Sequence, residues 1–234
     1  MNEPTDVSNI PGSYTLSVRS HQLVLLPDRA IYWPDRRTLI IADVHLGKGT
    51  AFRELGLPVP TGGSERDLAR ISALLAITAA GRLIILGDLI HAKASHQPRL
   101  HALFIDWRTR HSTLDILLVR GNHDRHAGML PDSWRVTEVE EPFDDDGLIL
   151  SHAPRAASGP TSAPVLAGHV HPVYAMRDFD RSVVRVPCFH LDTLAGCLTL
   201  PAFGNFTGGH CVSPALGHRF YLAIGKSGVR SLKL

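Results

Sequence analysis

A chain of 234 residues can form one large α/β domain or two small ones, and 44% hydrophobic with 20% charged residues is the composition of an ordinary globular protein. The formal net charge of +2 does not indicate a uniformly basic nucleic-acid-binding protein, although a local basic patch is compatible with it. The three cysteines, Cys188, Cys197 and Cys211, lack the C-x-x-C spacing of a zinc or redox site, so we expect reduced thiols.

The first residues are polar and contain prolines, so we expect a disordered tail over residues 1–13, followed by a single domain over residues 14–234. Glu3 and Asp6 stand where a secretory signal would carry basic residues and then an apolar run. No apolar stretch approaches the roughly 20 residues of a membrane-spanning helix. We therefore expect a cytoplasmic protein without a membrane partner.

Two segments have the periodicity of packing helices. The first covers about residues 64–80, with Ser64 as a candidate N-terminal cap and Gly81 as the stop signal. The second covers about residues 98–110 and begins with Pro98, which suits the first turn of a helix. The apolar faces are formed by Leu68, Ile71, Leu74 and Leu75 in the first helix and by Leu100, Leu103, Phe104 and Trp107 in the second.

Five apolar runs are too short for helices and are predicted to be buried strands: 38–42, 82–86, 114–119, 148–150 and 165–167. The first three alternate with helical segments, which predicts βαβ units and a largely parallel sheet. From Val183 onward, strand-like runs separated by turn residues predict a second, more antiparallel sheet. The predicted fold class is therefore α/β, a layered sandwich of two mixed β-sheets flanked by helices.

Each of the five predicted strands is followed by polar residues that can bind metals. In strand order they are Asp43 and His45, then Asp88, then Asn122, His123 and Asp124, then His152, then His169 and His171. Ligands of open α/β sheets bind at the carboxyl ends of the strands, so residues far apart in sequence can meet there. The five strand ends therefore predict one site.

Each motif alone has little weight, because Asp-x-His pairs occur by chance, Gly-Asp is often a turn, and a histidine after a strand is usually structural. Their ordered conjunction is specific, since a purely structural explanation needs five independent coincidences. Glycine directly precedes Asp88, Asn122 and His169, which predicts sharp turns or close approach of another segment.

The residue types indicate the kind of metal site. Carboxylates and imidazoles without cysteine suit Mn, Fe or Zn better than a structural zinc site or an all-oxygen calcium site. Seven candidate ligands exceed the needs of one ion, so we expect two ions that share a bridging carboxylate at a separation of ~3.5–4 Å.

The ordered motifs DVH, GD, GNHD, SH and GHVH resemble those of the calcineurin-like binuclear metallophosphoesterase superfamily, across residues 43–172. The resemblance implies a metallophosphoesterase fold, and it implies that one metal ion is held by Asp43, His45 and His171. The other ion would be held by Asn122, His152 and His169, with Asp88 bridging the two. His123 would act on the leaving oxygen, and Asp124 would orient the His123 ring.

The chemistry expected of this centre is hydrolysis of a phosphate ester. Two cations would lower the pKa of a bridging water until hydroxide exists near neutral pH, and they would neutralise the charge of an in-line displacement. His123 would protonate an alkoxide leaving group that departs poorly by itself.

Three longer segments, DVHLGKGTAFRELGLPVP, GDLIHAK and LPAFGNFTGGH, are similar to those of the bacterial ligase-associated DNA damage response endonucleases. This resemblance covers most of the chain. It implies manganese-dependent cleavage of single-stranded DNA in DNA repair, and a functional association with an ATP-dependent DNA ligase and a helicase.

Candidate substrate-binding residues lie close to the metal motifs. Lys48 and Arg53 follow the first motif on a predicted glycine-bearing loop, where they could contact flanking phosphates while Phe52 stacks on a base. His91 follows Asp88 closely enough to reach a substrate. The alternative is a solvated loop with one core aromatic and an ordinary surface histidine.

Two other functions are compatible with parts of the sequence. A phosphodiesterase or phosphatase for a small molecule, such as a cyclic nucleotide, could use the same metals in a closed pocket. A scaffold without catalysis could keep the fold, but it would not need the intact ligand set. A groove with arginines would favour DNA, and a deep pocket would favour the small substrate.

Overall fold

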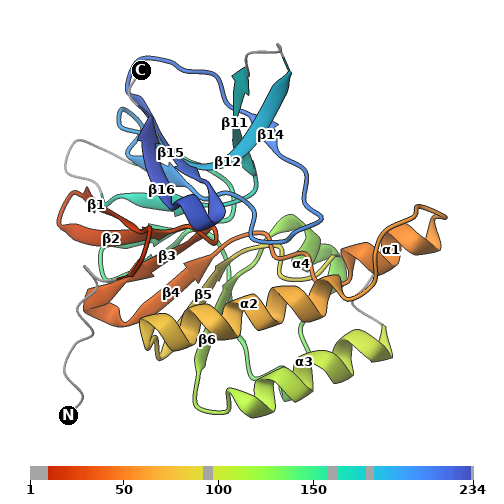
Figure 1. Cartoon of the computed structure of the whole chain (residues 1–234). Helices are drawn as coiled ribbons and strands as arrows, with labels where there is room; N and C mark the ends of the chain where they lie inside the picture. The colour runs from red at the N-terminus through yellow and green to blue at the C-terminus, as the bar shows by residue number, and fades with distance from the viewer. Residues whose placement is uncertain (1–9, 92–96, 158–162, 178–181, 233–234) are drawn as a thin grey trace.

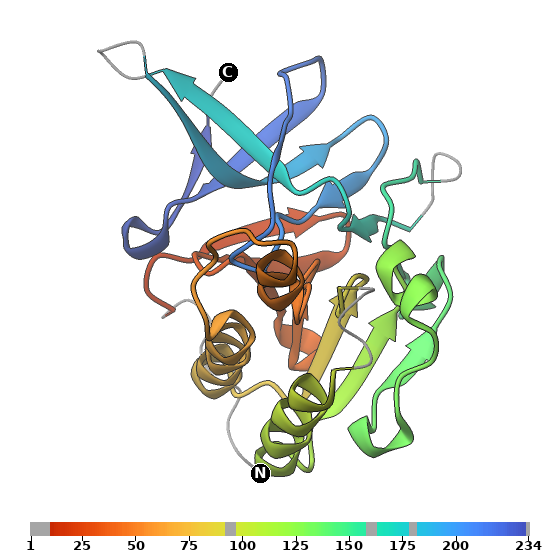
Figure 2. The ribbon, with the colours of Figure 1, turned by 90° about the vertical axis from the view of Figure 1, so that its right-hand side faces the viewer.

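The computed structural model describes residues 10–91, 97–157, 163–177 and 182–232. Its described residues form two β-sheets that face each other, with two longer helices on the outer side of the first sheet (Figure 1). Views from the two sides show the same stacking, and the short helix α1 projects from the side that faces the viewer in Figure 2. None of the helices in the described residues combines the length and apolar character needed to cross a membrane.

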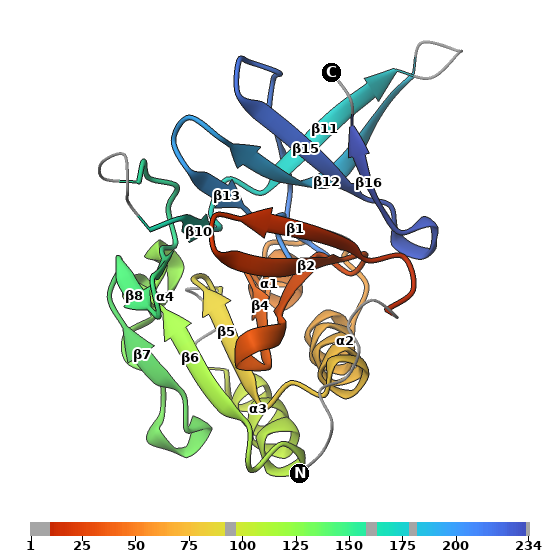
Figure 3. The ribbon, with the colours of Figure 1, turned by 90° about the vertical axis from the view of Figure 1, so that its left-hand side faces the viewer.

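The first sheet contains seven described strands in sequence order (Figure 3). They are β1 (Tyr14–Val18), β2 (His21–Leu26), β3 (Ala30–Trp33), β4 (Thr38–Ile41), β5 (Arg82–Leu86), β6 (Asp115–Val119) and β7 (Thr137–Val139). Strands β4, β5 and β6 are mutually parallel, as predicted, with Ile40 opposite Ile84. Strand β7 continues the parallel arrangement and was not predicted. The antiparallel β1 to β4 meander was not predicted, because β2 and β3 are buried on both faces and show little alternation.

The second sheet contains the remaining described strands. They are β8 (Phe143–Asp145), β9 (Leu148–Leu150), β10 (Val165–Ala167), β11 (Pro172–Arg177), β12 (Val183–Asp192), β13 (Cys197–Thr199), β14 (His210–Cys211), β15 (His218–Ala223) and β16 (Val229–Leu232). Strand β10 is parallel to β9 and β13, whereas β12 is antiparallel to its neighbours. Both sheets are therefore mixed, which confirms the predicted fold class.

Four α-helices are described: α1 (Lys48–Glu54), α2 (Gly63–Thr78), α3 (Pro98–Arg110) and α4 (Asn122–Ala127). Helices α2 and α3 correspond to the two predicted helices. The cap of α2 differs from the prediction: Gly62 in a left-handed conformation precedes the helix, and the Ser64 hydroxyl accepts a hydrogen bond from the Gly47 amide instead. The short helix α1 replaces a predicted loop, and the short helix α4 was not predicted. The described part of the chain also contains 3₁₀ turns at Pro34–Arg36, Asp132–Trp134 and Gly225–Ser227.

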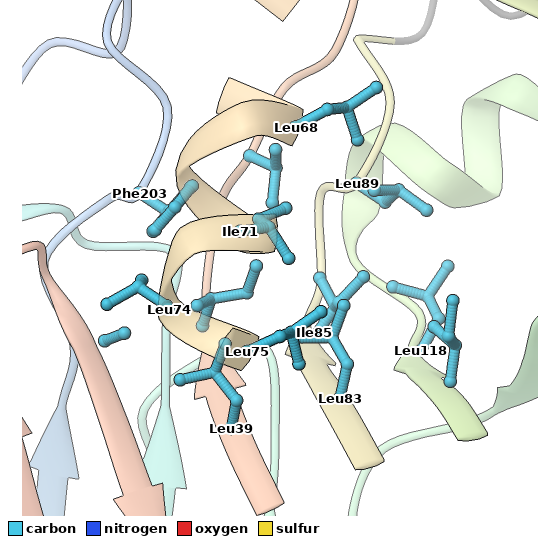
Figure 4. Packing of buried hydrophobic residues seen from close by; sticks show 14 of the residues in the cluster. Leu39, Leu68, Ile71, Leu74, Leu75, Leu83, Ile85, Leu89, Leu118 and Phe203 are labelled. Atoms are coloured by element: carbon cyan, nitrogen blue, oxygen red, sulfur yellow. The ribbon is translucent and has the colours of Figure 1, made fainter. Parts of the chain in front are cut away.

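One apolar core lies on each side of the first sheet. Because successive strand residues point to opposite faces, Leu39 and Ile41 of β4 pack toward the helices while Ile40 packs toward the second sheet. Figure 4 shows Leu68, Ile71, Leu74 and Leu75 of α2 directed at this helix-side core, which also contains Leu83, Ile85 and Phe203. This packing fixes the positions of the strand ends where the candidate site lies.

The predicted tail, residues 1–13, lies mostly outside the described residues. Ile10, which is described, packs against the helix-side core. The Val229 amide donates a hydrogen bond to the Gly12 carbonyl at 2.7 Å. Residues 10–13 therefore belong to the folded body, because backbone pairing beside β16 and apolar contact both hold them there.

Candidate metal centre

The five predicted strand ends meet at one place, but they come from both sheets. Strands β4, β5 and β6 of the first sheet contribute Asp43, Asp88 and Asn122 with their neighbours. Strands β9 and β10 belong to the second sheet and contribute the 152 and 168–171 segments. The backbones of the two sheets are joined here through segment 200–204, since the amides of Phe203 and Gly204 donate to the carbonyls of Ala42 and Asp43. The site therefore lies at the junction of the sheets.

The first predicted ligand set, Asp43, His45 and His171, is assembled as expected. One metal-binding atom from each of these residues lies within 4.8 Å of the other two. Asp43 Oδ1 is 3.2 Å from His171 Nε2. The Asp43 and His45 side chains are almost completely buried.

In the second predicted set, Asn122, His152 and His169, the candidate ligand atoms lie even closer to one another. His152 Nε2 lies 3.0 Å from Asn122 Oδ1 and 3.0 Å from His169 Nδ1. The other ring nitrogen of His152, Nδ1, is 3.1 Å from the Leu86 carbonyl. A proton on Nδ1 would donate to that carbonyl and leave the Nε2 lone pair for an ion, which is how outer partners orient metal-binding histidines.

Asp88 lies between the two sets, and its oxygens face different ways. Oδ1 is 3.6 Å from His152 Nε2, and Oδ2 is 3.7 Å from His45 Nε2. A carboxylate that presents one oxygen to each set has the geometry of a bridging ligand. Asp43, Asp88 and His152 also bring one ligand atom each within 4.8 Å of one another.

The residues present fit two divalent ions. Ligands at right angles on one ion with bonds of about 2.1 Å stand about 3 Å apart, which is the spacing found in the second set. In the first set, Asp43 Oδ1, His171 Nε2 and both ring nitrogens of His45 are buried without a hydrogen-bond partner. Buried polar atoms normally have partners, so bound cations would account for Asp43 Oδ1, His171 Nε2 and one nitrogen of His45, whose other nitrogen carries the proton of the neutral ring.

Backbone conformation adds a signal that the sequence motifs did not contain. Among the described residues, eleven non-glycine residues have positive φ, and five of them are predicted metal ligands: Asp43, His45, Asp88, His169 and His171. This left-handed region is uncommon for residues with a Cβ atom, and such strain concentrates at functional sites. The strand-end turns therefore aim these side chains at the centre at some conformational cost.

The glycines that precede the ligands were predicted to allow sharp turns or close approach, and the structure confirms close approach. A Cβ atom at Gly121 would overlap the Asp88 side chain, and one at Gly87 would overlap the His152 ring. Any side chain at these positions would displace a predicted ligand.

Burial and neighbouring cations control the charge of His45. Burial, followed by the charge of Lys48, lowers the pKa of His45 to about 2. The imidazole is therefore neutral near pH 7 and keeps a lone pair for an ion.

His123 lies beside the ligands without belonging to either set. Its amide donates to Asp88 Oδ1 at 2.9 Å, and its ring centroid is 4.9 Å from that of His45. Its Nδ1 is buried without a hydrogen-bond partner. Burial lowers the pKa of His123, although Asp88 acts in the opposite direction.

Asp124 does not orient the His123 ring as the resemblance implied. Its carboxylate accepts hydrogen bonds from the amides of Asp88 (2.7 Å), Gly121 (2.9 Å) and Ile90 (3.2 Å). Burial raises the pKa of Asp124 to about 6, against the effect of these amides. Asp124 instead joins the turn after β5 to the start of α4, because both segments donate to it.

The predicted substrate residues have different surroundings. Lys48 begins helix α1 with its Nζ 5.9 Å from the Phe52 ring centroid. Arg53 lies on the same helix and donates to Thr50 Oγ1 and the Pro60 carbonyl, so it holds the following segment. The predicted loop is wrong here, because the 47–54 segment closes helical hydrogen bonds.

His91 lies with the centre. Its ring stacks on His123 at 5.0 Å between centroids. One ring nitrogen each from His45, His91 and His123 lies within 4.8 Å of the other two. His91 therefore faces the same space as the predicted leaving-group histidine.

One hollow includes a predicted ligand in its lining, and another includes a residue between two predicted ligands. The first, of about 250 Å³, is bordered by His45, Lys48 and Phe206. The second, of about 380 Å³, is bordered by Arg155 and by Val170, which lies between the ligands His169 and His171. Sequence reasoning missed the second hollow, because its walls come from segments without a shared motif.

Comparisons with known proteins agree with this geometry. The calcineurin-like phosphoesterase family model matches residues 36–193, so the chain belongs to the calcineurin-like phosphoesterase family. This is a family of metal-dependent phosphoesterases, and the class of enzyme predicted from the sequence is confirmed.

Among solved structures, the chain is similar to the Pseudomonas putida nuclease MPE. The two share 43% identity with a TM-score of 0.80, over 94% of this chain and 100% of that one. The phosphoesterase Yfce from E. coli matches at 18% identity and a TM-score of 0.37, over 83% and 97% of the respective chains. The comparison with curated proteins gives no match.

Proposed function

We propose that this phosphoesterase is a two-metal endonuclease, which cleaves internal phosphodiester bonds of single-stranded DNA. The observation that carries the proposal is the pair of ligand sets around Asp88 in a chain 43% identical to a nuclease over nearly its whole length. The same likeness supports membership of the ligase-associated endonuclease family suggested by the sequence.

The surroundings of the metal centre support a polynucleotide over a small substrate. The hollow with Lys48 lies on the His45 side, and the hollow with Arg155 lies on the Val170 side. The amide of His210, which borders the second hollow, donates to the carbonyl of His171. A strand that continues past the scissile phosphate in both directions can use both hollows, whereas a cyclic mononucleotide would need one pocket.

The residues of the centre have distinct tasks in this proposal. When bound, two divalent ions activate a water and neutralise charge on the phosphate. Asp43, His45 and His171 would hold one ion, Asn122, His152 and His169 the other, and Asp88 both. The amide of His123 is bound to Asp88, its ring Nδ1 is buried without a partner, and in this proposal the ring supplies a proton to the departing sugar oxygen. His91 stacks on His123 and contacts the same phosphate group.

Manganese is the proposed ion. The ligand set of carboxylate and amide oxygens with imidazole nitrogens suits first-row dications, and iron or zinc would meet the same requirement. The resemblance to ligase-associated endonucleases supports a role in DNA repair, beside an ATP-dependent DNA ligase and a helicase. The polar N-terminal sequence and the lack of long apolar stretches support a cytoplasmic location. We treat residues 14–234 as one catalytic domain, against which residues 10–13 pack.

The substrate proposal is tested by adding manganese to the purified chain and comparing four substrates: single-stranded DNA, duplex DNA, cyclic nucleotides and bis-nitrophenyl phosphate. We expect single-stranded DNA to have the highest kcat/KM of the natural substrates, and circular single strands to be cut. Asp88→Asn, prepared in parallel, is the inactive control. Preference for a cyclic nucleotide, or no cleavage of circles, would contradict the proposal.

A further inference from the structure

Glu141 holds the segment that carries the ligand His152. It follows β7 in the chain, precedes residues 151–153 by ten residues or more, and belongs to none of the metal motifs. One oxygen, Oε2, accepts hydrogen bonds from the amides of His152 at 2.7 Å and Ala153 at 2.9 Å and lies 2.8 Å from the Ser151 hydroxyl, whose single proton it shares with the Ala153 carbonyl. Three donors from consecutive residues therefore converge on a single carboxylate oxygen.

The other oxygen of Glu141 is directed at helix α4. Arg125 donates to Oε1 from Nη2 at 3.3 Å and from Nη1 at 3.4 Å. Helix α4 begins at Asn122, the ligand whose Oδ1 lies 3.0 Å from His152 Nε2. Glu141 thus stands between the two elements that supply Asn122 and His152.

Glu141 is favoured in its charged form although its side chain has little exposure to solvent. The Glu141 side chain is 19% exposed. Burial acts to raise the pKa of Glu141, but the donors from Ala153, Ser151, His152 and Arg125 outweigh it and keep the pKa below its usual value. Hydrogen bonds to a charged acceptor are the stronger kind, so the contact restrains both segments.

We propose that Glu141 is a positioning residue for the second metal ion, acting by fixing the backbone of His152 relative to Asn122. The inference rests on the two-metal centre of the proposed function. Outer partners of metal ligands typically change metal affinity by about 10–100-fold when they are removed. The effect is specific to one ion, because the hydrogen bonds of Glu141 reach the His152 segment and α4 and do not reach Asp43, His45 or His171 in the described residues.

The neighbouring Glu140 provides a matched control. It has the same charge and also pairs with Arg125, at 3.0 Å, but its side chain is 63% exposed. In the described part of the chain its hydrogen bonds go to Arg125 and not to residues 151–153. A general effect of negative charge near α4 would appear in both variants, whereas positioning of His152 would appear only at Glu141.

The experiment titrates Mn²⁺ into the metal-free full chain and follows binding by calorimetry and by the electron paramagnetic resonance signal of the ion pair. Wild type, Glu141→Ala, Glu141→Gln and Glu140→Gln are compared. We expect Glu141→Ala to bind the ion of the Asn122, His152 and His169 set about 10–100-fold more weakly, with the affinity for the other ion unchanged. Glu141→Gln keeps an acceptor oxygen and should lose less, and Glu140→Gln should match wild type. Saturating manganese should restore the DNA cleavage of Glu141→Ala.

Equal weakening of both ions, an equal loss in Glu140→Gln, or unchanged binding in Glu141→Ala would overturn the positioning role. If Glu141→Ala does not fold, Ser151→Ala removes one of the three donors and should show the same selective loss at smaller size. The binding measurement uses no DNA. A wild-type chain that binds two ions but fails to cleave DNA would therefore contradict the proposed function and leave the role of Glu141 open to the same titration.

Discussion

The two halves of the metal centre differ in how the protein supports them. In the second half, His152 has its Nδ1 next to the Leu86 carbonyl and its amide bound to Glu141. In the first half, both ring nitrogens of His45 and Oδ1 of Asp43 are buried without partners. The contrast teaches that both the ring and the backbone of His152 are held by protein contacts, whereas in the first half Asp43 Oδ2 is held by the His169 amide and the His45 ring has no such contact in the described part of the chain.

The largest effect should come from His123, which shares the unpartnered character of the first half. Because its Nδ1 lacks a protein partner, we expect it to serve the substrate and not an ion. His123→Ala should reduce DNA cleavage by about 10²–10⁴-fold, the usual size of general acid catalysis, with metal content unchanged. Bis-nitrophenyl phosphate should lose much less, because its leaving group needs no proton. Loss of a metal ion, or equal losses on both substrates, would assign His123 to positioning.

A smaller effect, on the stability of the metal-free protein, should distinguish the two halves of the centre. With a chelator present to remove metal ions, His152→Leu loses the hydrogen bonds of the His152 ring to the Leu86 carbonyl and to Asn122. This variant should lower the free energy of unfolding by about 1–3 kcal/mol. His45→Leu removes only unpartnered nitrogens and should leave that free energy unchanged or raise it. Thermal and urea unfolding measure both variants. Equal destabilisation would show that the halves are supported alike.

The smallest effect concerns the flanks of the centre. Arg155→Ala and Lys48→Ala should weaken binding of single-stranded DNA and flatten its salt dependence by about 0.7 in logarithmic slope for each phosphate that the variant no longer neutralises. Arg177, an exposed residue of β11 that borders neither hollow, is the control. Fluorescence anisotropy at several salt concentrations measures the slopes. Unchanged slopes in both hollow variants would place the DNA elsewhere.

The convergence of the candidate ligands could be predicted because each of them follows an apolar strand whose period and length are local properties of the sequence. The sheet to which each strand belongs could not be predicted. Segments 148–150 and 165–167 look like the earlier apolar runs, but they pair with each other, and 165–167 also pairs with β13. The same limit applies to Arg53. Its neighbours Gly47 and Gly49 suggest a loop, whereas the segment forms helix α1.

Residues that act through backbone contacts were the hardest to predict. Asp124 follows His123 directly, so a contact with that ring was a natural expectation, but the amides of Asp88 and Gly121 come closer once the chain folds. Glu141 gave no signal, because its partners are three consecutive residues that only the folded chain brings to it. Supporting residues of this kind become visible only in the structure.

The central claim is that Asp88 is shared by two ions, one in each half of the centre. A crystal of the chain grown with Mn²⁺ and measured at the manganese absorption edge tests this directly. We predict two anomalous peaks roughly 3.5–4 Å apart, with Asp88 Oδ1 on the ion bound by Asn122, His152 and His169 and Oδ2 on the other. A single fully occupied peak in a crystal of active enzyme, or two peaks that Asp88 does not join, would contradict the account.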